Sequence, residues 1–548
     1  MKRLLTLALA AAAAMTAMAV PPMPGFLNIP QPDGSTVEAR IIGDNEFHYY
    51  ETRDGEFLVD QKGFLRPATA RRVEELKAEH MTAREAQMTK AQSRIAPGTI
   101  RNDFPTTGEL KGLVVLAEFQ DVKFQPESTV EHFNKKLNEK GYTGPETNGS
   151  AYDYFVEQSN GVFHPQFDVV GPVTLSKTRA EYGQSEDLNS FFLEAAKLAD
   201  SELGVDFSQY DSNGDYYIDF FMVIFAGHGE AQGGPTECIW PAKKDMSYEL
   251  YDRFDDVYMG QAACFCELKY GTGTTLDGIG TLVHEYSHIL GLPDIYDSGS
   301  TGCYGMGHFD LMCYGPYNDD SLTPSGYTAM DKYTLGWVTP RVLDAPAKDV
   351  TLEPLSSTND CIFIVNPDNK DEYYTLENRQ PIGFDKGLPG HGLVITLVNY
   401  NRSAWAKNMV NTLFSVFEHV AIVAADNNKT LNSNEIKFTN FEAGDPFPGS
   451  ENVTAFTATT TPGAIWRSSG DPLPAPDVRI TNIRESADGI ITFDFNTEET
   501  AIADIVAADG EKEYFTLMGQ KVSADKLGSG IYIERDANGQ TRKVAVSR

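Results

Sequence analysis

The stretch TLVHEYSHILGLPDIYD, residues 281–297, constrains the fold of this chain more than any other. His284 and His288 are four residues apart, so a helix would place both imidazoles on one face. Gly291 tolerates the left-handed turn that ends a helix, and Pro293 forbids its continuation. The sequence therefore predicts a helix that carries two histidines and ends at Gly291, where the chain changes direction.

These residues have the spacing of a metal site that activates water. Two neutral imidazole nitrogens leave zinc in need of a third protein ligand and an open position for water. The turn after the helix can bring Asp294 back to the ion, with Asp297 as the competing third ligand. Glu285 stands next to His284 and can reach the water as general base. The alternative is an ordinary amphipathic helix whose polar residues face outward.

The composition limits the class of partner. The chain of 548 residues has 78 Asp and Glu against 45 Lys and Arg, a formal charge of −33. Nucleic-acid binding and docking on an anionic membrane both need clustered basic residues, so we expect neither. The length is too great for one hydrophobic core and predicts about two to four domains. Six cysteines, an even number, permit disulfides whose pairing stays open.

Residues 1–19 have the layout of a secretory signal peptide. A basic start, Lys2 and Arg3, precedes a short apolar run, and small residues before Val20 set the expected cleavage site. The run is shorter than the ~20 apolar residues that span a bilayer, and no later segment reaches that length. We therefore expect no transmembrane segment and an exported protein, extracellular or retained on the outer cell surface.

Four regions follow the signal peptide. Residues 20–103 read as β-hairpins and a charged helical linker, which favours a propeptide; the alternative is a small β domain on a helical arm. Residues 104–340 alternate strands and helices and predict an α+β domain, in which residues 150–175 predict a helix, a turn and two strands. Residues 341–497 predict a β-sandwich-like domain, and residues 498–548 predict a small module of short strands.

HEYSHILGLPD resembles the HExxHxxGxxD motif of the metzincin zinc peptidases, and specifically the immune inhibitor A-type secreted metallopeptidases. The resemblance covers roughly residues 105–495 and includes SAYDYFVEQSNGVFHPQFDVVGPVTL, YDSNGDYYIDFFMVIFAGHGEAQGG, EYYTLENRQPIGFDKGLPGHGLVI and GDPFPG. It implies an α+β zincin (metzincin-like) catalytic domain followed by all-β, sandwich-like modules. It also implies a secreted zinc endopeptidase, with zinc held by His284, His288 and Asp294.

The resemblance suggests further roles. Metzincins carry a methionine turn beneath the zinc, which matches Met312 of DLMCYG, with Met306 of CYGMG as the alternative. Tyr314 resembles the tyrosine that helps to stabilise the oxyanion in some metzincins; a structural tyrosine is the alternative. The strand GLVITLVNYN lacks a His that the similar family often carries there. The propeptide has no Cys, so latency would need an Asp or Glu on the zinc, with processing expected between Arg94 and Arg101.

Residues 211–219, DSNGDYYID, resemble a calcium loop. Side-chain oxygens stand at its first, third, fifth and ninth positions, on Asp211, Asn213, Asp215 and Asp219. The loop departs from the EF-hand form at its sixth and twelfth positions, which lack the Gly and the Glu of that motif. The alternative to a structural calcium ion is an Asp- and Asn-rich turn that leads into the next strand.

The leading interpretation is a secreted zinc endopeptidase that acts on protein and peptide substrates. Two alternatives remain: a catalytically silent binding protein built on β modules, and a calcium-dependent adhesion protein that uses the loop at 211–219. Residues 498–548 resemble the sorting tails of type IX-secreted proteins, which implies a type IX-like secretion machinery as a partner. The alternative for these residues is a small structural module.

Overall fold

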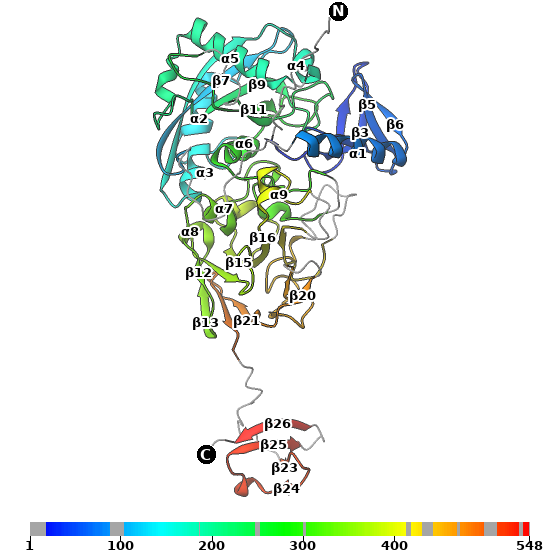
Figure 1. Ribbon diagram of the computed structural model, residues 1–548, viewed down its shortest axis with the longest axis vertical. Helices are drawn as coiled ribbons and strands as arrows, with labels where there is room; N and C mark the ends of the chain where they lie inside the picture. Colours follow the sequence, from blue (N-terminus) through cyan, green and yellow to red (C-terminus); the bar gives the residue numbers. More distant parts are fainter. Residues whose placement is uncertain are drawn as a thin grey trace, which may run out of the picture. The chain divides into compact units, whose positions relative to one another are not determined.

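The chain divides into two compact units, Met1–Phe495 and Asn496–Arg548 (Figure 1). The predicted signal peptide up to residue 17 and the expected processing region between Arg94 and Arg101 lie outside the described residues. The computed structural model describes residues 18–87, 104–185, 187–246, 253–299, 303–412, 418–429, 442–467, 472–497, 512–535 and 541–546.

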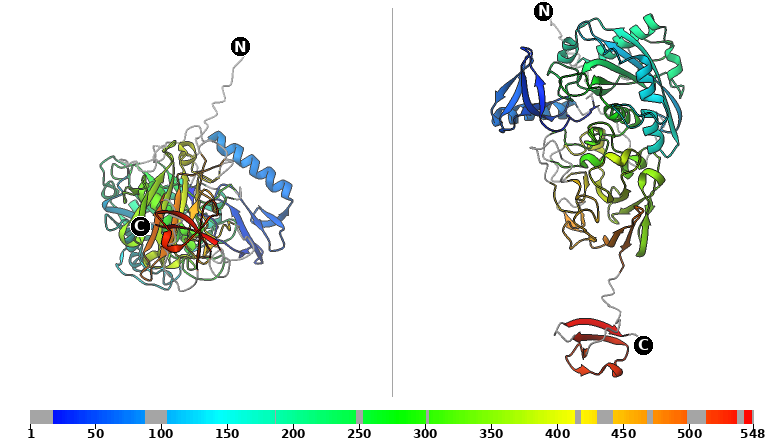
Figure 2. Two further views of the ribbon diagram at one scale, coloured as in Figure 1. Left: turned by 90° about the horizontal axis from the view of Figure 1, so that it is seen from below. Right: turned by 180° about the vertical axis from the view of Figure 1, so that it is seen from behind.

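Residues 18–87 form an N-terminal module that is mostly an antiparallel sheet. After the short strand β1 (Met18–Ala19), five strands follow in chain order: β2 (Leu27–Pro30), β3 (Thr36–Gly43), β4 (His48–Glu51), β5 (Phe57–Gln61) and β6 (Phe64–Ala68). Helix α1 (Ala70–Gln87) packs beside this sheet through buried Val73 and through His80, whose ring stacks on Phe47 (Figures 1 and 2). The charged stretch expected as a helix or a linker is therefore helical as far as Gln87.

A six-stranded sheet forms the centre of residues 104–340, the region expected from the sequence to be catalytic and called the catalytic region below. Its order is β1, β10 (Ala242–Asp245), β11 (Gln261–Leu268), β9 (Phe221–His228), β7 (Gly108–Glu118) and β8 (Phe163–Thr174). The last four are parallel, whereas β10 is antiparallel to β11 and β1 is antiparallel to β10. Strand β1 thus extends the sheet at the edge that β10 would otherwise present.

The prediction of two strands after the turn at residues 160–161 was wrong, because β8 is one strand of twelve residues. Gly171 and Pro172 lie within this strand, although proline cannot donate a ladder hydrogen bond. The register between β7 and β8 shifts between Val115 and Ala117, which places this pair at a bulge. A bulge leaves a residue unpaired without ending the strand, so the Gly-Pro pair is accommodated.

Both faces of this sheet are buried, which explains the continuous apolar runs of its strands. Along β9, Phe221, Val223 and Phe225 face one hydrophobic cluster, and Met222 and Ile224 face another. Helix α5 (Leu188–Leu203) covers the first face, and α2 (Val130–Asn138), α3 (Ala151–Gln158) and α6 (Gly280–Leu290) cover the second (Figure 1). Shorter helices are α4 (Arg179–Ser185), α7 (Ala329–Thr334), α8 (Leu355–Thr358) and α9 (Arg402–Ala406).

Residues 341–495 form several mostly antiparallel sheets. The first has the order β12 (Arg341–Val342), β14 (Cys361–Val365), β15 (Glu372–Arg379), β16 (Gly392–Asn399) and β17 (Val420–Ile422). The second has the order β13 (Ala347–Leu352), β22 (Ile491–Phe495), β21 (Arg479–Glu485) and β18 (Phe456–Thr457), and β19 (Ile465–Trp466) pairs with β20 (Leu473–Pro474).

The first of these sheets joins two cores. On β14, Ile362 and Ile364 pack against the second sheet, while Cys361 and Phe363 belong to the cluster around α6. This alternation follows from the two-residue period of a strand with both faces buried. The β region expected as a separate domain therefore contributes to the core around α6.

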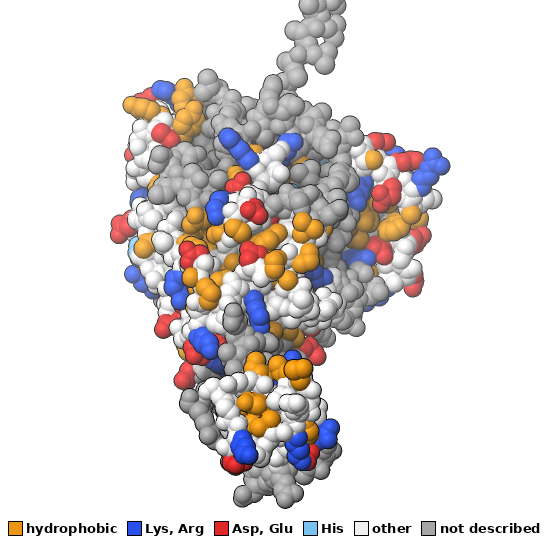
Figure 3. Space-filling model, turned by 60° about the horizontal axis from the view of Figure 1, so that its bottom comes forward, with side chains coloured by type: hydrophobic (Ala, Val, Ile, Leu, Met, Phe, Trp, Pro, Cys, Tyr) orange, Lys and Arg blue, Asp and Glu red, His pale blue; other side chains and the backbone are white. Residues whose placement is uncertain are grey.

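The second unit has its own small sheet, in the order β24 (Lys521–Val522), β23 (Glu513–Thr516), β25 (Gly530–Arg535) and β26 (Thr541–Val546). Its core consists of Tyr514, Leu527 and Val544. Hydrophobic side chains also lie on its surface (Figure 3), and its most exposed large ones are those of Leu517, Met518 and Ile531.

The structure can be compared with two expectations from the sequence, which concern disulfides and transmembrane segments. All six cysteines lie in the described ranges, and none of them forms a disulfide. Among the described residues, no helix is both long and apolar enough to cross a membrane.

Candidate metal centre

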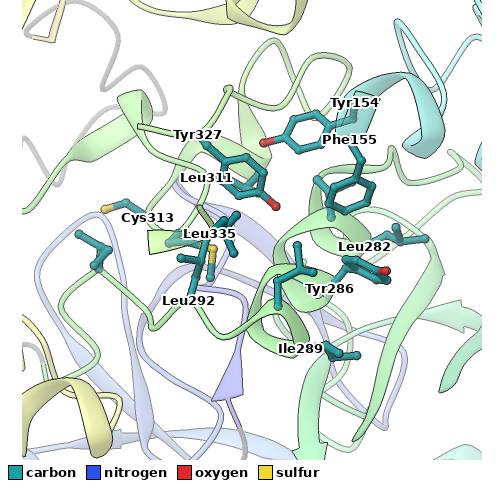
Figure 4. Packing of buried hydrophobic residues seen from close by; sticks show 14 of the residues in the cluster. Tyr154, Phe155, Leu282, Tyr286, Ile289, Leu292, Leu311, Cys313, Tyr327 and Leu335 are labelled. Atoms are coloured by element: carbon teal, nitrogen blue, oxygen red, sulfur yellow. The ribbon is translucent and has the colours of Figure 1, made fainter. Parts of the chain in front are cut away.

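Helix α6 has the predicted end. Gly291 caps it with φ 108°, a left-handed conformation that favours glycine, and its N–H donates to the carbonyls of Ser287 and His288. Every residue of the helix is buried, so the alternative of an amphipathic helix with outward-facing polar residues is wrong. Leu282, Tyr286 and Ile289 pack into the surrounding cluster (Figure 4).

Three buried side chains converge at this helix: His284, His288 and Asp294, whose ligand atoms lie within 4.8 Å of one another. The Nε2 atoms of both histidines are 3.2 Å from Asp294 Oδ1. Within the described ranges, no other His, Cys, Asp or Glu side chains form such a group. Asp297, the competing third ligand, instead accepts the N–H of Cys303 at 3.1 Å.

The converging atoms have the hydrogen-bonding pattern of metal ligands. His284 Nε2, His288 Nε2 and Asp294 Oδ1 are buried and, in the described part of the chain, make no hydrogen bond. Buried polar atoms rarely stay unsatisfied, and a cation at their common centre would satisfy all three. Zinc prefers two imidazoles and a carboxylate of this kind, with a fourth position left open.

Backbone carbonyls orient both imidazoles. His284 Nδ1 lies 2.9 Å from the carbonyl of Leu311, and His288 Nδ1 lies 2.9 Å from the carbonyl of Leu292. A carbonyl only accepts, so each Nδ1 carries the proton and each Nε2 directs its lone pair to the centre.

An asparagine orients the third side chain. Asn408, just after α9, donates from Nδ2 to Asp294 Oδ2 and accepts the Asp294 N–H at 2.8 Å. Sequence reasoning missed this contact, because the two residues are 114 positions apart and no local pattern pairs them.

Burial and the neighbouring side chains together set the charges of His288, Asp294 and Glu285. Burial lowers the pKa of His288 to about 4, which keeps the imidazole neutral. Burial alone would raise the pKa of Asp294, but His288 and His284 outweigh it and lower that pKa, which keeps the carboxylate charged. Burial, and then the charge of Asp294, raises the pKa of Glu285 well above its usual range.

The segment expected to hold the methionine turn does lie against the site. Met312 is buried, donates its N–H to Asp310 Oδ1 and accepts the N–H of Ile295, both at 2.8 Å. The preceding carbonyl, of Leu311, is the one that holds His284. Tyr314 is partly buried and its ring centre lies 6.0 Å from that of His308.

The start of the N-terminal module reaches Glu285. The N–H of Val20 donates to Glu285 Oε1 at 2.6 Å. The carbonyl of the preceding residue, Ala19, accepts the hydroxyl of Tyr296 at 2.8 Å. The peptide bond between residues 19 and 20 is therefore contacted from both sides by the catalytic region.

The next residues continue along the catalytic region. The carbonyl of Val20 accepts Trp240 Nε1 at 3.0 Å, and that of Pro21 accepts the Tyr317 hydroxyl at 2.6 Å. Met23 donates its N–H to the Ala231 carbonyl at 2.7 Å. Sequence reasoning missed these contacts, as it did Tyr296, because no local pattern pairs a chain start with residues over 200 positions away.

The predicted calcium loop is held by hydrogen bonds of its own. The Asp211 carboxylate accepts the N–H groups of Gly214, Asp215 and Tyr216, and Asp219 accepts that of Ser212. Asn213 donates to Asp215 at 3.2 Å. This is the geometry of an Asp- and Asn-rich turn, and the calcium ion stays a prediction.

Comparison with known proteins agrees with this geometry. Residues 111–335 match the family described as immune inhibitor A peptidase M6, catalytic domain. The chain is similar to immune inhibitor A of Bacillus thuringiensis subsp. alesti, with 30% identity over 39% of this chain and 36% of that protein. It is also similar to the pre-pro-metalloprotease PrtV of Vibrio cholerae serotype O1 (strain M66-2), with 28% identity over 31% of this chain and 22% of that protein.

The matched region thus spans about a third of one curated relative and about a fifth of the other. The family match at residues 111–335 contains helix α6, both histidines and Asp294. The family match and the buried His-His-Asp group together identify residues 111–335 as a metalloprotease catalytic domain of the immune inhibitor A (M6) peptidase family.

Proposed function

We propose that the chain is the precursor of an exported zinc endopeptidase with a metzincin-like zincin domain, which acts on extracellular proteins. One observation carries this proposal: a peptide bond of the chain itself lies against Glu285, beside three buried side chains that can hold zinc. Protein and peptide substrates would enter the place that this segment takes.

The chain's own residues supply the acid–base chemistry. When bound, zinc would polarise the scissile carbonyl and lower the pKa of a water molecule. His284, His288 and Asp294 would hold it. Glu285 takes a proton from the attacking water as a C–O bond forms at the carbonyl carbon. It then gives that proton to the nitrogen as the C–N bond breaks, which leaves a carboxylic acid and an amine.

Residues 20–103 would act as a propeptide, since their first residues lie where a substrate must bind. The N–H of Val20 is 2.6 Å from Glu285, and its side chain is fully buried. Removal of a signal peptide before Val20 would turn this nitrogen into an α-ammonium that pairs with the Glu285 carboxylate. This contact would take the place of the Asp or Glu expected to hold the enzyme latent.

Zinc content and hydrolysis of casein, measured on the same preparations, test the proposal. The processed wild type should hold about one zinc and cleave casein, and a chelator should stop cleavage. Asp294→Ala should lose both zinc and activity, because two ligands rarely retain zinc. The matched control, Asp297→Ala, should keep both. Zinc loss from the control alone would show that the third ligand is wrongly assigned, and an inactive zinc-loaded wild type would refute the function.

A further inference from the structure

We propose that Tyr296 is the catalytic tyrosine, whose hydroxyl holds the scissile carbonyl oxygen, in place of Tyr314. The inference rests on the proposed peptidase function. It comes from the path of residues 18–23, which follow the course of a substrate through the site.

The first argument is the direction of the segment. Strand β1 pairs antiparallel with β10, with Met18 opposite Lys243 and Ala19 opposite Ala242. An extended peptide commonly binds a protein by adding a strand to a free sheet edge. Without β1, β10 is such an edge, so a substrate can bind there through the same backbone hydrogen bonds.

The second argument is how the peptide bond between Ala19 and Val20 is held. Hydrolysis needs a donor at the carbonyl oxygen, where negative charge develops, and a proton donor at the nitrogen. At this bond, the Tyr296 hydroxyl lies 2.8 Å from the carbonyl oxygen, and Glu285 Oε1 lies 2.6 Å from the nitrogen. Both distances are those of catalytic hydrogen bonds.

The third argument is the support of Tyr296. The residue is 2% exposed, and it stands two positions after Asp294. The N–H of its neighbour Ile295 donates to the carbonyl of Met312, which fixes this stretch to the segment beneath His284. A donor held this rigidly needs little reorganisation when the oxyanion forms.

Two further aromatic side chains contact the segment that follows the 19–20 peptide bond. Three successive carbonyls, of Ala19, Val20 and Pro21, each accept one hydrogen bond from an aromatic side chain: Tyr296, Trp240 and Tyr317. Only the first lies on the bond that Glu285 contacts. Trp240 and Tyr317 would hold the part of a substrate that follows the cleaved bond.

The assigned step balances without a change in the tyrosine. Water oxygen adds to the carbonyl carbon, and the electron pair of the C=O bond moves to oxygen, where the Tyr296 O–H donates to it. When the C=O bond re-forms, the C–N bond breaks and the nitrogen takes the proton held by Glu285. Tyr296 keeps its own proton throughout.

Tyr296→Phe and Tyr314→Phe, in the processed zinc enzyme, test the assignment as a matched pair. Loss of an oxyanion donor costs about 10²- to 10³-fold in kcat. We therefore expect Tyr296→Phe to lower kcat by that factor, with KM within about threefold and zinc and Tm unchanged. Tyr314→Phe should stay within about threefold in kcat.

A second pair of variants separates binding from catalysis. Trp240→Phe and Tyr317→Phe should raise KM and leave kcat within about threefold, as expected for groups that bind substrate and transition state alike. An unchanged kcat in Tyr296→Phe, or the large loss in Tyr314→Phe, would overturn the assignment. Loss of zinc or of folding in Tyr296→Phe would also overturn it, since that would show a structural role. An inactive wild type would refute the proposed function instead.

Discussion

The two small β modules of this chain look alike in sequence and differ in how they are packed. The N-terminal module has five antiparallel strands, and the described part of the C-terminal unit has four. The N-terminal module shares one apolar cluster with the catalytic region, in which Ile29, Tyr50 and Leu58 meet Trp240 and Tyr317. The C-terminal unit has a core of its own, of Tyr514, Leu527 and Val544.

The difference shows that a short hairpin pattern does not determine whether a small sheet packs on a neighbouring region or forms a core of its own. A small sheet buries too little apolar surface to be very stable alone, so it gains much from a neighbouring surface. The N-terminal module packs its apolar side chains on the catalytic region and also makes polar contacts with that region. Glu230 accepts the Tyr50 hydroxyl at 3.1 Å and lies 3.0 Å from His48, and Thr236 donates to Asp60 at 2.9 Å.

The largest expected effect is release of activity when the N-terminal module is removed. A tethered segment acts at an effective concentration of about millimolar, so processing near Arg94 to Arg101 should raise the rate at least about 100-fold. Initial rates on a fluorogenic peptide before and after processing measure it. The processed Glu285→Ala protein controls for a contaminating protease. Equal specific activity of precursor and processed enzyme would refute latency.

A smaller effect should come from pH at the contact between His48 and Glu230. Burial lowers the pKa of His48, but the charge and hydrogen bond of Glu230 outweigh it and raise the net pKa. Protonated His48 thus stabilises the docking of the N-terminal module on the catalytic region. This stabilisation is fully present below the pKa of undocked His48, about 6.5, and it is lost as the pH rises through the raised pKa of docked His48. Residual precursor activity, relative to processed enzyme, should therefore rise with pH.

His48→Gln should flatten this pH dependence. The matched control is His80→Gln, since His80 lies 3.5 Å from Glu46 within the same module. A wild-type precursor whose relative activity falls as the pH rises would contradict the assignment to His48. So would a control variant that flattens the profile as much as His48→Gln does.

The smallest effect in vitro should come from removal of the C-terminal unit. A chain that ends near Thr500 should keep its Tm and its hydrolysis rate, because the second unit has its own core. If this unit is a sorting address, the shortened enzyme should also accumulate in the periplasm. Normal export with stability lower by several kcal/mol, as for a lost β layer, would reverse this interpretation.

Local sequence patterns predicted the centre of the site, but they did not predict the long-range contacts around it. His284, His288, Gly291 and Asp294 lie within eleven residues, where helix period and turn chemistry decide their placement. Asn408, by contrast, meets Asp294 only because the β region packs on the same core, and the N-terminal segment reaches Glu285 across 265 positions. Such contacts follow from tertiary packing, which no local pattern encodes.

In the fold, too, local patterns indicated the strands but not the contacts that the strands make. Strands β9 and β14 contain continuous apolar runs, and the reason for those runs appears only in the structure, since each strand is buried on both faces. The two strands predicted after the turn at residues 160–161 form one strand, because β8 continues through a bulge opposite β7. A single sequence does not show where a bulge lets a strand continue past a Gly-Pro pair.

The most direct test of the account is Glu285→Ala in the processed enzyme, with zinc content and peptide hydrolysis measured on one preparation. Glu285 contacts the peptide bond between residues 19 and 20 and is not among the three residues whose ligand atoms converge. We therefore predict that hydrolysis falls by about 10²- to 10⁴-fold, the range for loss of a general acid–base, while zinc stays near one per chain. Loss of zinc together with activity, or activity that survives the substitution, would contradict the account.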